Sequence, residues 1–166
     1  MAGVGLDGEV ARRANTLPRW LRGHGGYVLS LVPTILNFAP FALKLLTRQE
    51  NCNWETKSDK PVLLAVFANT PFYGGGMKVA PTAKMDDGWL DVCLVRGVAA
   101  LRLLFLFPSV YAGRHLKIRE VEYFPAKNIR VETEHALDVY ADGEFACRTP
   151  VEIGIQPGAL KVITPA

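Results

Sequence analysis

The chain has 166 residues, 49% of them hydrophobic and 21% charged, which is typical of a folded domain and excludes a disordered chain. Its formal net charge of +3 is too small to indicate nucleic-acid binding, although it suits contact with an anionic surface. No run reaches the roughly 18 apolar residues of a membrane span, and no signal-peptide pattern precedes the first element. Cys52, Cys93 and Cys147 form no disulfide or zinc pattern, so we expect one cytoplasmic domain over residues 1–166.

The first predicted element is an apolar helix over residues 17–35, which contains a Gly-Gly pair. Pro33 and Pro40 predict that this helix ends in the thirties. Alternating apolar residues then predict a strand over 41–45, and the polar stretch 51–60 is typical of a hairpin turn.

Two short apolar runs, at 61–69 and 89–98, predict buried strands. Residues 99–113 have helical spacing, with Pro108 expected to kink the helix and Gly113 expected to cap it. The rest of the chain alternates between β-prone runs and turn residues, which predicts a β meander. We infer an α+β domain with two helices, dominated by antiparallel sheet.

A glycine-rich stretch, FANTPFYGGGMKVAPTAKMDDGWLDVCLV at 67–95, is the most unusual part of the sequence. Its three consecutive glycines allow a close approach of backbone to a neighbour, and Asp86 and Asp87 occupy a tight turn. The pattern fits a glycine-rich loop followed by a hairpin turn. It also fits a hard-cation site, since carboxylate and carbonyl oxygens are the ligands that Mg²⁺ requires.

Asp142, Gly143 and Glu144 lie between two strand-like runs and are also open to two interpretations. One is a two-residue hairpin turn, which Asp-Gly favours. The other is phosphoryl transfer, in which one carboxylate accepts the proton of the attacking hydroxyl and another helps to hold the metal ion.

The three histidines, His24, His115 and His135, are expected at surface or capping positions. No Ser-His-Asp order, Cys-His pair or Walker-type phosphate loop is present in the sequence. Hydrolases and P-loop enzymes are therefore excluded.

Four segments resemble those of a known protein family and occur in the same order along the chain. They are GVGLDGEV near the start, the glycine-rich stretch above, ADGEF, and IQPGALKVITP at the end. They resemble the C-terminal half of bacterial diacylglycerol kinases and related lipid kinases, which are relatives of sphingosine kinases. The resemblance implies a β-sandwich like the second domain of NAD kinases and diacylglycerol kinases, beside a smaller α/β domain. Nucleotide and lipid would meet in the cleft between the two domains.

The resemblance also implies roles for the late Asp-Gly-Glu motif. Asp142 would be the base toward the lipid hydroxyl or would help to bind magnesium, while Gly143 and Glu144 would lie near the nucleotide. Sphingosine kinases place an acidic base in the other domain, so the resemblance leaves open which domain supplies the base.

A structural Mg²⁺ site is implied at the side chain of Asp87 and the backbone carbonyls of Lys84 and Trp89. Glu9 matches the position at which sphingosine kinases hold an acidic residue against the lipid head group. Arg22 is expected to contact a phosphate of ATP, the phosphate donor.

The family's glycine-rich GGDGT-type phosphate loop is expected upstream of this chain, in an N-terminal nucleotide-binding domain of the same protein. Alone, the chain is therefore expected to be a poor kinase or none. The lipid substrate is expected at the membrane surface, with which the protein would associate peripherally. The competing hypothesis is a noncatalytic lipid-binding or regulatory module whose apolar segment 101–111 contacts the membrane. The glycine triplet and Asp-Asp-Gly argue against an NAD kinase. The sequence does not specify which lipid is phosphorylated or whether the protein forms a homodimer.

Overall fold

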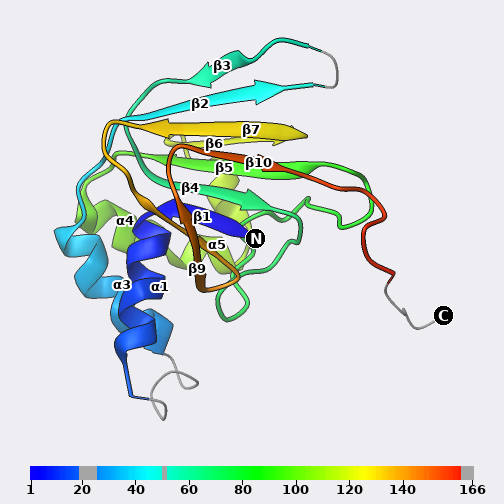
Figure 1. The fold of residues 1–166 in the computed structure, drawn as a ribbon. Helices are drawn as coiled ribbons and strands as arrows, with labels where there is room; N and C mark the ends of the chain where they lie inside the picture. Colours follow the sequence, from blue (N-terminus) through cyan, green and yellow to red (C-terminus); the bar gives the residue numbers. More distant parts are fainter. Residues whose placement is uncertain (19–25, 50–51, 162–166) are drawn as a thin grey trace.

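The computed structural model describes residues 1–18, 26–49 and 52–161, whose strands form two antiparallel sheets packed face to face (Figure 1). The strands of the larger sheet are β1 (Ala2–Gly5), β4 (Val62–Ala68), β5 (Leu90–Arg96), β6 (Val121–Ala126), β8 (Asp138–Ala141) and β9 (Glu144–Arg148). They lie in the order β6-β5-β4-β1-β8-β9. The strands of the smaller sheet are β2 (Leu43–Arg48), β3 (Glu55–Ser58), β7 (Asn128–Thr133) and β10 (Val151–Gly154). Their order is β10-β7-β2-β3.

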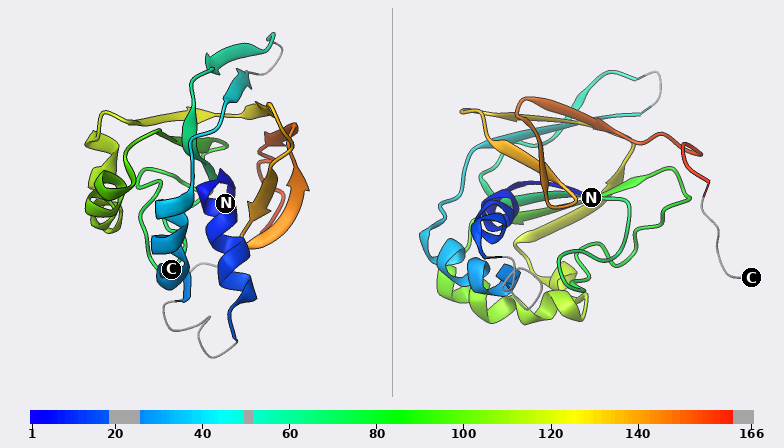
Figure 2. Two further views of the ribbon diagram at one scale, coloured as in Figure 1. Left: turned by 90° about the vertical axis from the view of Figure 1, so that its left-hand side faces the viewer. Right: turned by 60° about the horizontal axis from the view of Figure 1, so that its bottom comes forward.

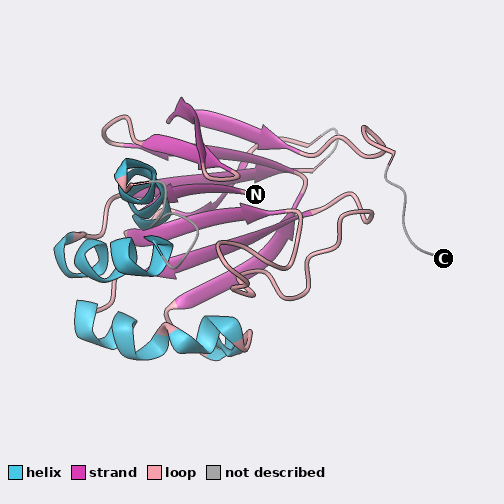
Figure 3. Cartoon of the chain, turned by 90° about the horizontal axis from the view of Figure 1, so that it is seen from below, coloured by secondary structure: helices cyan, strands magenta, loops and turns pink. Residues whose placement is uncertain are grey.

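Helices cover the face of the six-stranded sheet that points away from the smaller sheet (Figures 1 and 3). They are α1 (Leu6–Thr16), α3 (Gly26–Asn37), α4 (Ala100–Leu106), α5 (Pro108–Tyr111) and the 3₁₀ helix η1 (Arg114–Lys117). The two turned views show the same arrangement of helices, larger sheet and smaller sheet (Figure 2). The chain therefore folds into three layers, with the larger sheet in the middle.

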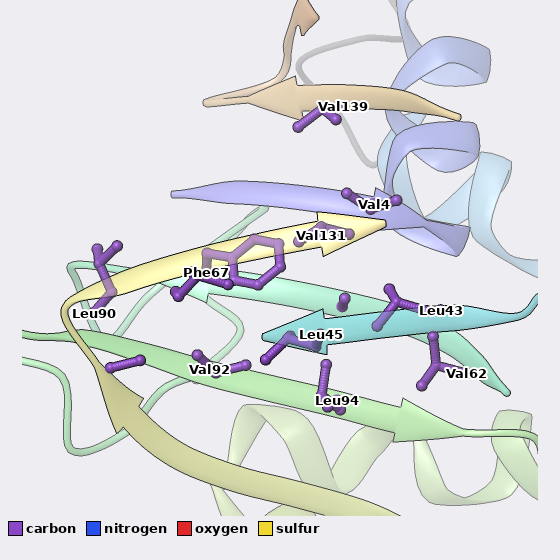
Figure 4. Close-up of a cluster of buried hydrophobic side chains, with 13 residues drawn as sticks. Val4, Leu43, Leu45, Val62, Phe67, Leu90, Val92, Leu94, Val131 and Val139 are labelled. Atoms are coloured by element: carbon purple, nitrogen blue, oxygen red, sulfur yellow. The ribbon is translucent and has the colours of Figure 1, made fainter. Parts of the chain in front are cut away.

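The main core lies between the two sheets (Figure 4). Phe67 and Leu94 project from the larger sheet, and Leu43, Leu45 and Val131 project from the smaller one; each is at most 1% exposed. Successive side chains of a strand point to opposite faces, so alternate residues of each strand supply this core. The two sheets are held together by hydrophobic burial.

Strand β4 is apolar along its whole length because both of its faces are covered. Phe67 points into the core between the sheets, whereas Val66 and Ala68 pack with Cys93 in a second cluster on the opposite face. Leu64 lies against the buried side chains of α1 and α3. The central strand thus links the core to the helical layer.

Several predictions from the sequence are confirmed. The predicted strands at 61–69 and 89–98 are β4 and β5, and the mainly β, antiparallel sandwich is present. The helix predicted at 99–113 is divided into α4 and α5, with Pro108 opening α5. Gly113 follows the helix in the left-handed conformation, at φ 65°, as a capping glycine does.

The first helix was predicted wrongly at its start. Leu17 is extended, at φ −69° and ψ 152°, and ends α1 rather than beginning a helix. The second described helix, α3, spans residues 26–37, so its end in the thirties is confirmed, while 19–25 lie outside the described residues. Helix α1 was not predicted: four of its eleven residues are charged, and Gly8, a poor helix former, lies in its first turn.

Two predictions about the β structure need correction. The polar stretch 51–60 is not only a turn, because β3 lies within it and pairs with β2. The last strands do not form a simple meander, because β7 pairs with β2 and β10 in the smaller sheet while β6 pairs with β5 in the larger one. Alternation predicts that a strand forms but not which strand is its partner.

Candidate functional site

Asp142 and Gly143 form the two-residue turn between β8 and β9. Their φ angles are 49° and 87°, as a type I′ hairpin turn requires. The Asp142 backbone N–H donates to the carbonyl of Met1 at 2.9 Å, and its carboxylate accepts from the Met1 amine at 2.8 Å. Since the Asp142 side chain is 85% exposed, the turn holds a carboxylate out into solvent.

A cleft of about 320 Å³ lies beside this turn. Apolar and polar groups both line it, and we call it the polar cleft because it contains Asn15, Thr70 and Asp142. Its walls are the Asp142-Gly143 turn, one side of α1 with Ala11 and Asn15, and residues 70–74 of the glycine-rich stretch. Asn15 donates from Nδ2 to the carbonyl of Gly143 at 2.9 Å, which joins α1 to the turn. Two motifs that are distant in the sequence therefore share one cleft.

An apolar cavity of about 100 Å³ lies between the larger sheet and the helices. Its walls include Leu64 and Val66 of β4, Ile35 of α3, and Leu103 and Phe107 on or beside α4. An engineered cavity of about 150 Å³ binds benzene, so this smaller space has room for only a few methylene groups.

Tyr73 lines both the apolar cavity and the polar cleft. Its hydroxyl donates a hydrogen bond to Oδ1 of Asp7, a side chain that is only 6% exposed and that also lines the apolar cavity. Neither Asp7 nor Tyr73 was among the predicted site residues. The signal available was an aspartate between Leu6 and Val10, the apolar residues of one helix face.

Glu9 lies away from both of these spaces. It lines a separate depression with Phe38, and its carboxylate accepts from Arg12 at 2.7 and 2.8 Å and from Arg13 at 2.8 Å. Hydrogen bonding to Arg12, together with Arg13, lowers the pKa of Glu9 to about 2. The acidic residue that the resemblance assigns to the lipid head group is thus already paired with two arginines.

The proposed metal residues lie in the loop between β4 and β5. Asp87 accepts the backbone N–H of Trp89 through Oδ1 at 2.9 Å, so its side chain folds back over the turn, and Lys84 is exposed nearby in the sequence. Across residues 1–18, 26–49 and 52–161, no group of three or more His, Cys, Asp or Glu is arranged to hold an ion. One carboxylate with two carbonyls is nevertheless a hard-oxygen set that suits Mg²⁺, which keeps several waters.

A hydrogen-bond network around the buried Asp91 anchors the same loop. Asp91 of β5 is 6% exposed and accepts from the hydroxyls of Tyr123, at 2.7 Å, and Thr82, at 3.4 Å. Burial and the hydrogen bond to Asp91 raise the pKa of Tyr123, so its hydroxyl stays protonated. This network was not predictable from local patterns, because it joins residues from three separate segments of the chain.

Asp87→Ala is expected to lower the melting temperature by about 2–4 °C, through loss of a hydrogen bond of about 1 kcal/mol. If Asp87 helps to hold Mg²⁺, added Mg²⁺ is expected to raise the melting temperature of the wild type and not that of Asp87→Ala. Scanning calorimetry with and without Mg²⁺ measures both effects, with Asp86→Ala as the control for charge. An equal response to Mg²⁺ in wild type and Asp87→Ala would contradict the metal assignment.

The remaining predicted residues are placed as follows. Gly143 lies in the wall of the polar cleft, and Glu144 begins β9 with its side chain exposed. Arg22 lies outside the described residues. Within the described ranges, no helix combines the length and the apolar character needed to cross a bilayer.

Comparisons with known proteins agree with this fold. Residues 1–164 match the family model of the YegS C-terminal NAD kinase beta sandwich-like domain. The chain is 36% identical over 165 residues to a diacylglycerol kinase of Mycobacterium tuberculosis, covering 99% of this chain and 51% of that protein. It is 32% identical over 172 residues to the Bacillus subtilis protein named "Putative lipid kinase YtlR", covering 98% of this chain and 53% of that protein.

A crystal structure of a "putative diacylglycerol kinase" from Bacillus anthracis superposes with a TM-score of 0.66 at 24% identity, covering 95% of this chain and 49% of that one. This likeness shows the fold alone. The chain spans about half the length of the curated relatives it matches. The chain therefore belongs to the family of YegS C-terminal NAD kinase beta sandwich-like domains, whose named relatives here are diacylglycerol and lipid kinases.

Proposed function

We propose that this domain is the C-terminal part of an ATP-dependent kinase that phosphorylates the hydroxyl of diacylglycerol or a related lipid. The observation that carries the proposal is a residue shared by two unlike spaces. An apolar cavity suited to hydrocarbon shares Tyr73 with a polar cleft that contains Asp142. A lipid with its chain in the cavity would present its head group to the cleft.

Different residues of the cleft would have different roles in phosphate transfer. Asp142 carries an exposed carboxylate that would accept the proton of the lipid hydroxyl or help to hold Mg²⁺, with Gly143 and Glu144 beside the nucleotide. When bound, Mg²⁺ neutralises the negative charge of the phosphates. A second Mg²⁺ held by Asp87 and the carbonyls of Lys84 and Trp89 would stabilise the loop between β4 and β5.

The phosphates of ATP would be held mainly by a second, nucleotide-binding domain of the same protein, in line with the greater length of the relatives. Backbone N–H groups of a glycine-rich loop are the usual donors to a triphosphate. The isolated chain is therefore expected to transfer little or no phosphate.

The cavity can be tested with this chain alone. Val110→Trp, which places a large side chain at a residue lining the cavity, is expected to weaken binding of monomeric dioctanoylglycerol. Each methylene excluded costs about 0.8 kcal/mol, so excluding two lowers affinity by about tenfold. Titration calorimetry below the micelle-forming concentration measures this effect.

The matched control is Leu101→Trp, on the outward side of the neighbouring helix α4, where the native side chain is 76% exposed. It is expected to bind monomeric lipid as the wild type does. Equal affinity of all three proteins would show that the lipid does not enter this cavity.

A second candidate function is a noncatalytic lipid-binding or regulatory module. The observation that favours it is the outer side of α4, where Leu101 is 76% and Phe105 is 84% exposed. Exposed basic residues, Arg114 and Lys117, follow in η1 and would favour an anionic membrane. Both candidates predict peripheral association with a bilayer, and phosphate transfer distinguishes them.

A further inference from the structure

We propose that the lipid bound by this domain carries a second hydrogen-bond donor, an amide N–H or a second hydroxyl, which donates to His115 in the wall of the apolar cavity. The inference rests on the proposed lipid-kinase function. It concerns the part of the lipid next to the head group, because the cavity has room for only a few methylene groups and shares one lining residue with the polar cleft.

The His115 ring is a buried part of the cavity wall. It lies in η1 and is 4% exposed, whereas the sequence predicted a surface or capping position. Its Nε2 lies 3.1 Å from the carbonyl oxygen of Val79. Since a carbonyl oxygen only accepts hydrogen bonds, Nε2 carries the ring proton, and Nδ1 is an acceptor in the neutral ring. Burial lowers the pKa of His115, which keeps the ring neutral at pH 7.

Two buried acceptor atoms of the cavity-lining residues have no hydrogen-bond partner in the part of the chain that the structure describes. One is Nδ1 of His115 and the other is Oε2 of Glu120. The second carboxylate oxygen of Glu120 forms an ion pair with Arg102 at 2.8 Å. A buried acceptor without a partner destabilises the folded protein, and a ligand that donates to it offsets this cost. The cavity therefore favours a ligand with a hydrogen-bond donor.

Diacylglycerol has only one such donor, the hydroxyl that would receive the phosphate. For transfer this hydroxyl must lie in the polar cleft with Asp142, which His115 does not line, so its proton is not available to Nδ1. The ester oxygens of diacylglycerol only accept and would face another acceptor. A lipid with an amide N–H in place of an ester oxygen, or with an added hydroxyl near the head group, supplies the missing donor. The site therefore fits an N-acylated or hydroxylated lipid better than diacylglycerol.

Lipids that differ from one another at a single group test the inference. Dioctanoylglycerol is compared with an amide analogue, in which N–H replaces the ester oxygen on the central glycerol carbon. A third probe carries a hydroxyl on the carbon next to one ester carbonyl. Wild-type protein is expected to bind at least one of the two analogues about five- to tenfold more tightly than dioctanoylglycerol, the factor that one net hydrogen bond provides. Titration calorimetry with each lipid as a monomer gives the affinities.

Substitutions of His115 show whether the preference arises there. His115→Phe keeps a planar ring without nitrogens, and His115→Leu removes the ring as well. Both are expected to reduce the preference to about twofold or less. His115→Gln keeps an N–H for the Val79 carbonyl and an acceptor oxygen, so it is expected to retain part of the preference. His135→Phe makes the same change at an exposed histidine and is expected to leave all affinities unchanged.

The ring-nitrogen NMR signals of the wild type supply a readout that needs no substitution. The preferred analogue is expected to shift the Nδ1 signal of His115 in the direction of a hydrogen-bonded imidazole nitrogen, and dioctanoylglycerol to shift it less. A residue that only stabilises the fold would respond equally to both lipids.

The outcomes separate this inference from the proposed function. Wild-type protein that binds dioctanoylglycerol as tightly as both analogues would overturn the inference while the lipid function stands. A preference that persists in both His115→Phe and His115→Leu would do the same, because the donor would then bind elsewhere. If the wild type binds none of the three lipids, the lipid function and the inference are contradicted together.

Discussion

Asp142→Asn is expected to lower kcat by about 100- to 10,000-fold in the protein joined to its nucleotide-binding domain, because it removes a proton acceptor or metal ligand. Folding should be little affected. Asp142 occupies the left-handed region, at φ 49°, where asparagine is as well tolerated as aspartate. Its side chain is 85% exposed, so the substitution leaves no buried polar group without a partner.

To interpret this result, kcat and the melting temperature are measured for Asp142→Asn and for a control variant. Glu152→Gln removes one carboxylate from the exposed side of β10 and is expected to retain wild-type kcat and melting temperature. Should Asp142→Asn turn over substrate at the wild-type rate, Asp142 would be a turn residue only, and Glu144 or the other domain would have to supply the base.

Phe67→Ala is expected to lower the free energy of unfolding by about 3–5 kcal/mol, the range measured for removal of a buried aromatic ring. Phe67, near the C-terminal end of β4, is 1% exposed and packs between the two sheets (Figure 4). Since total stabilities are about 5–15 kcal/mol, this single change should remove a large part of the total. Urea unfolding followed by circular dichroism measures it.

Phe145→Ala is the matched control, because it deletes the same ring from β9, where the side chain is 55% exposed. The expected loss is about 1 kcal/mol or less, which includes its edge-to-face contact with Tyr140. Equal losses in the two variants would mean that the core between the sheets does not dominate stability.

The parts of the fold that were predictable from sequence are those with a strong local pattern. Residues of β4 and β5 form short apolar runs bounded by turns, and Pro108 and Gly113 mark helix boundaries through their own backbone restrictions. The pairing of strands was not predictable from local patterns. The partners of β7 lie in β2 and β10, and nothing in its own residues specifies them.

In the candidate site, too, local features were predictable from the sequence and contacts between distant residues were not. The Asp142-Gly143 turn was predictable, because Asp-Gly favours two successive positive φ angles. The pairing of Asp7 with Tyr73 was not, since 66 residues separate them and only the packing of α1 on the larger sheet brings them together. Glu9 was assigned by resemblance, whereas its engagement by Arg12 and Arg13 depends on helix geometry.

The most direct test of the account is phosphate transfer from labelled ATP to diacylglycerol in mixed micelles, with this chain alone and with the chain joined to a nucleotide-binding domain of its family. We expect transfer only by the joined protein, and its loss in Asp142→Asn. If the joined protein, correctly folded and able to bind both ATP and lipid, transfers no phosphate, the lipid-kinase account is contradicted and the domain is a lipid-binding module.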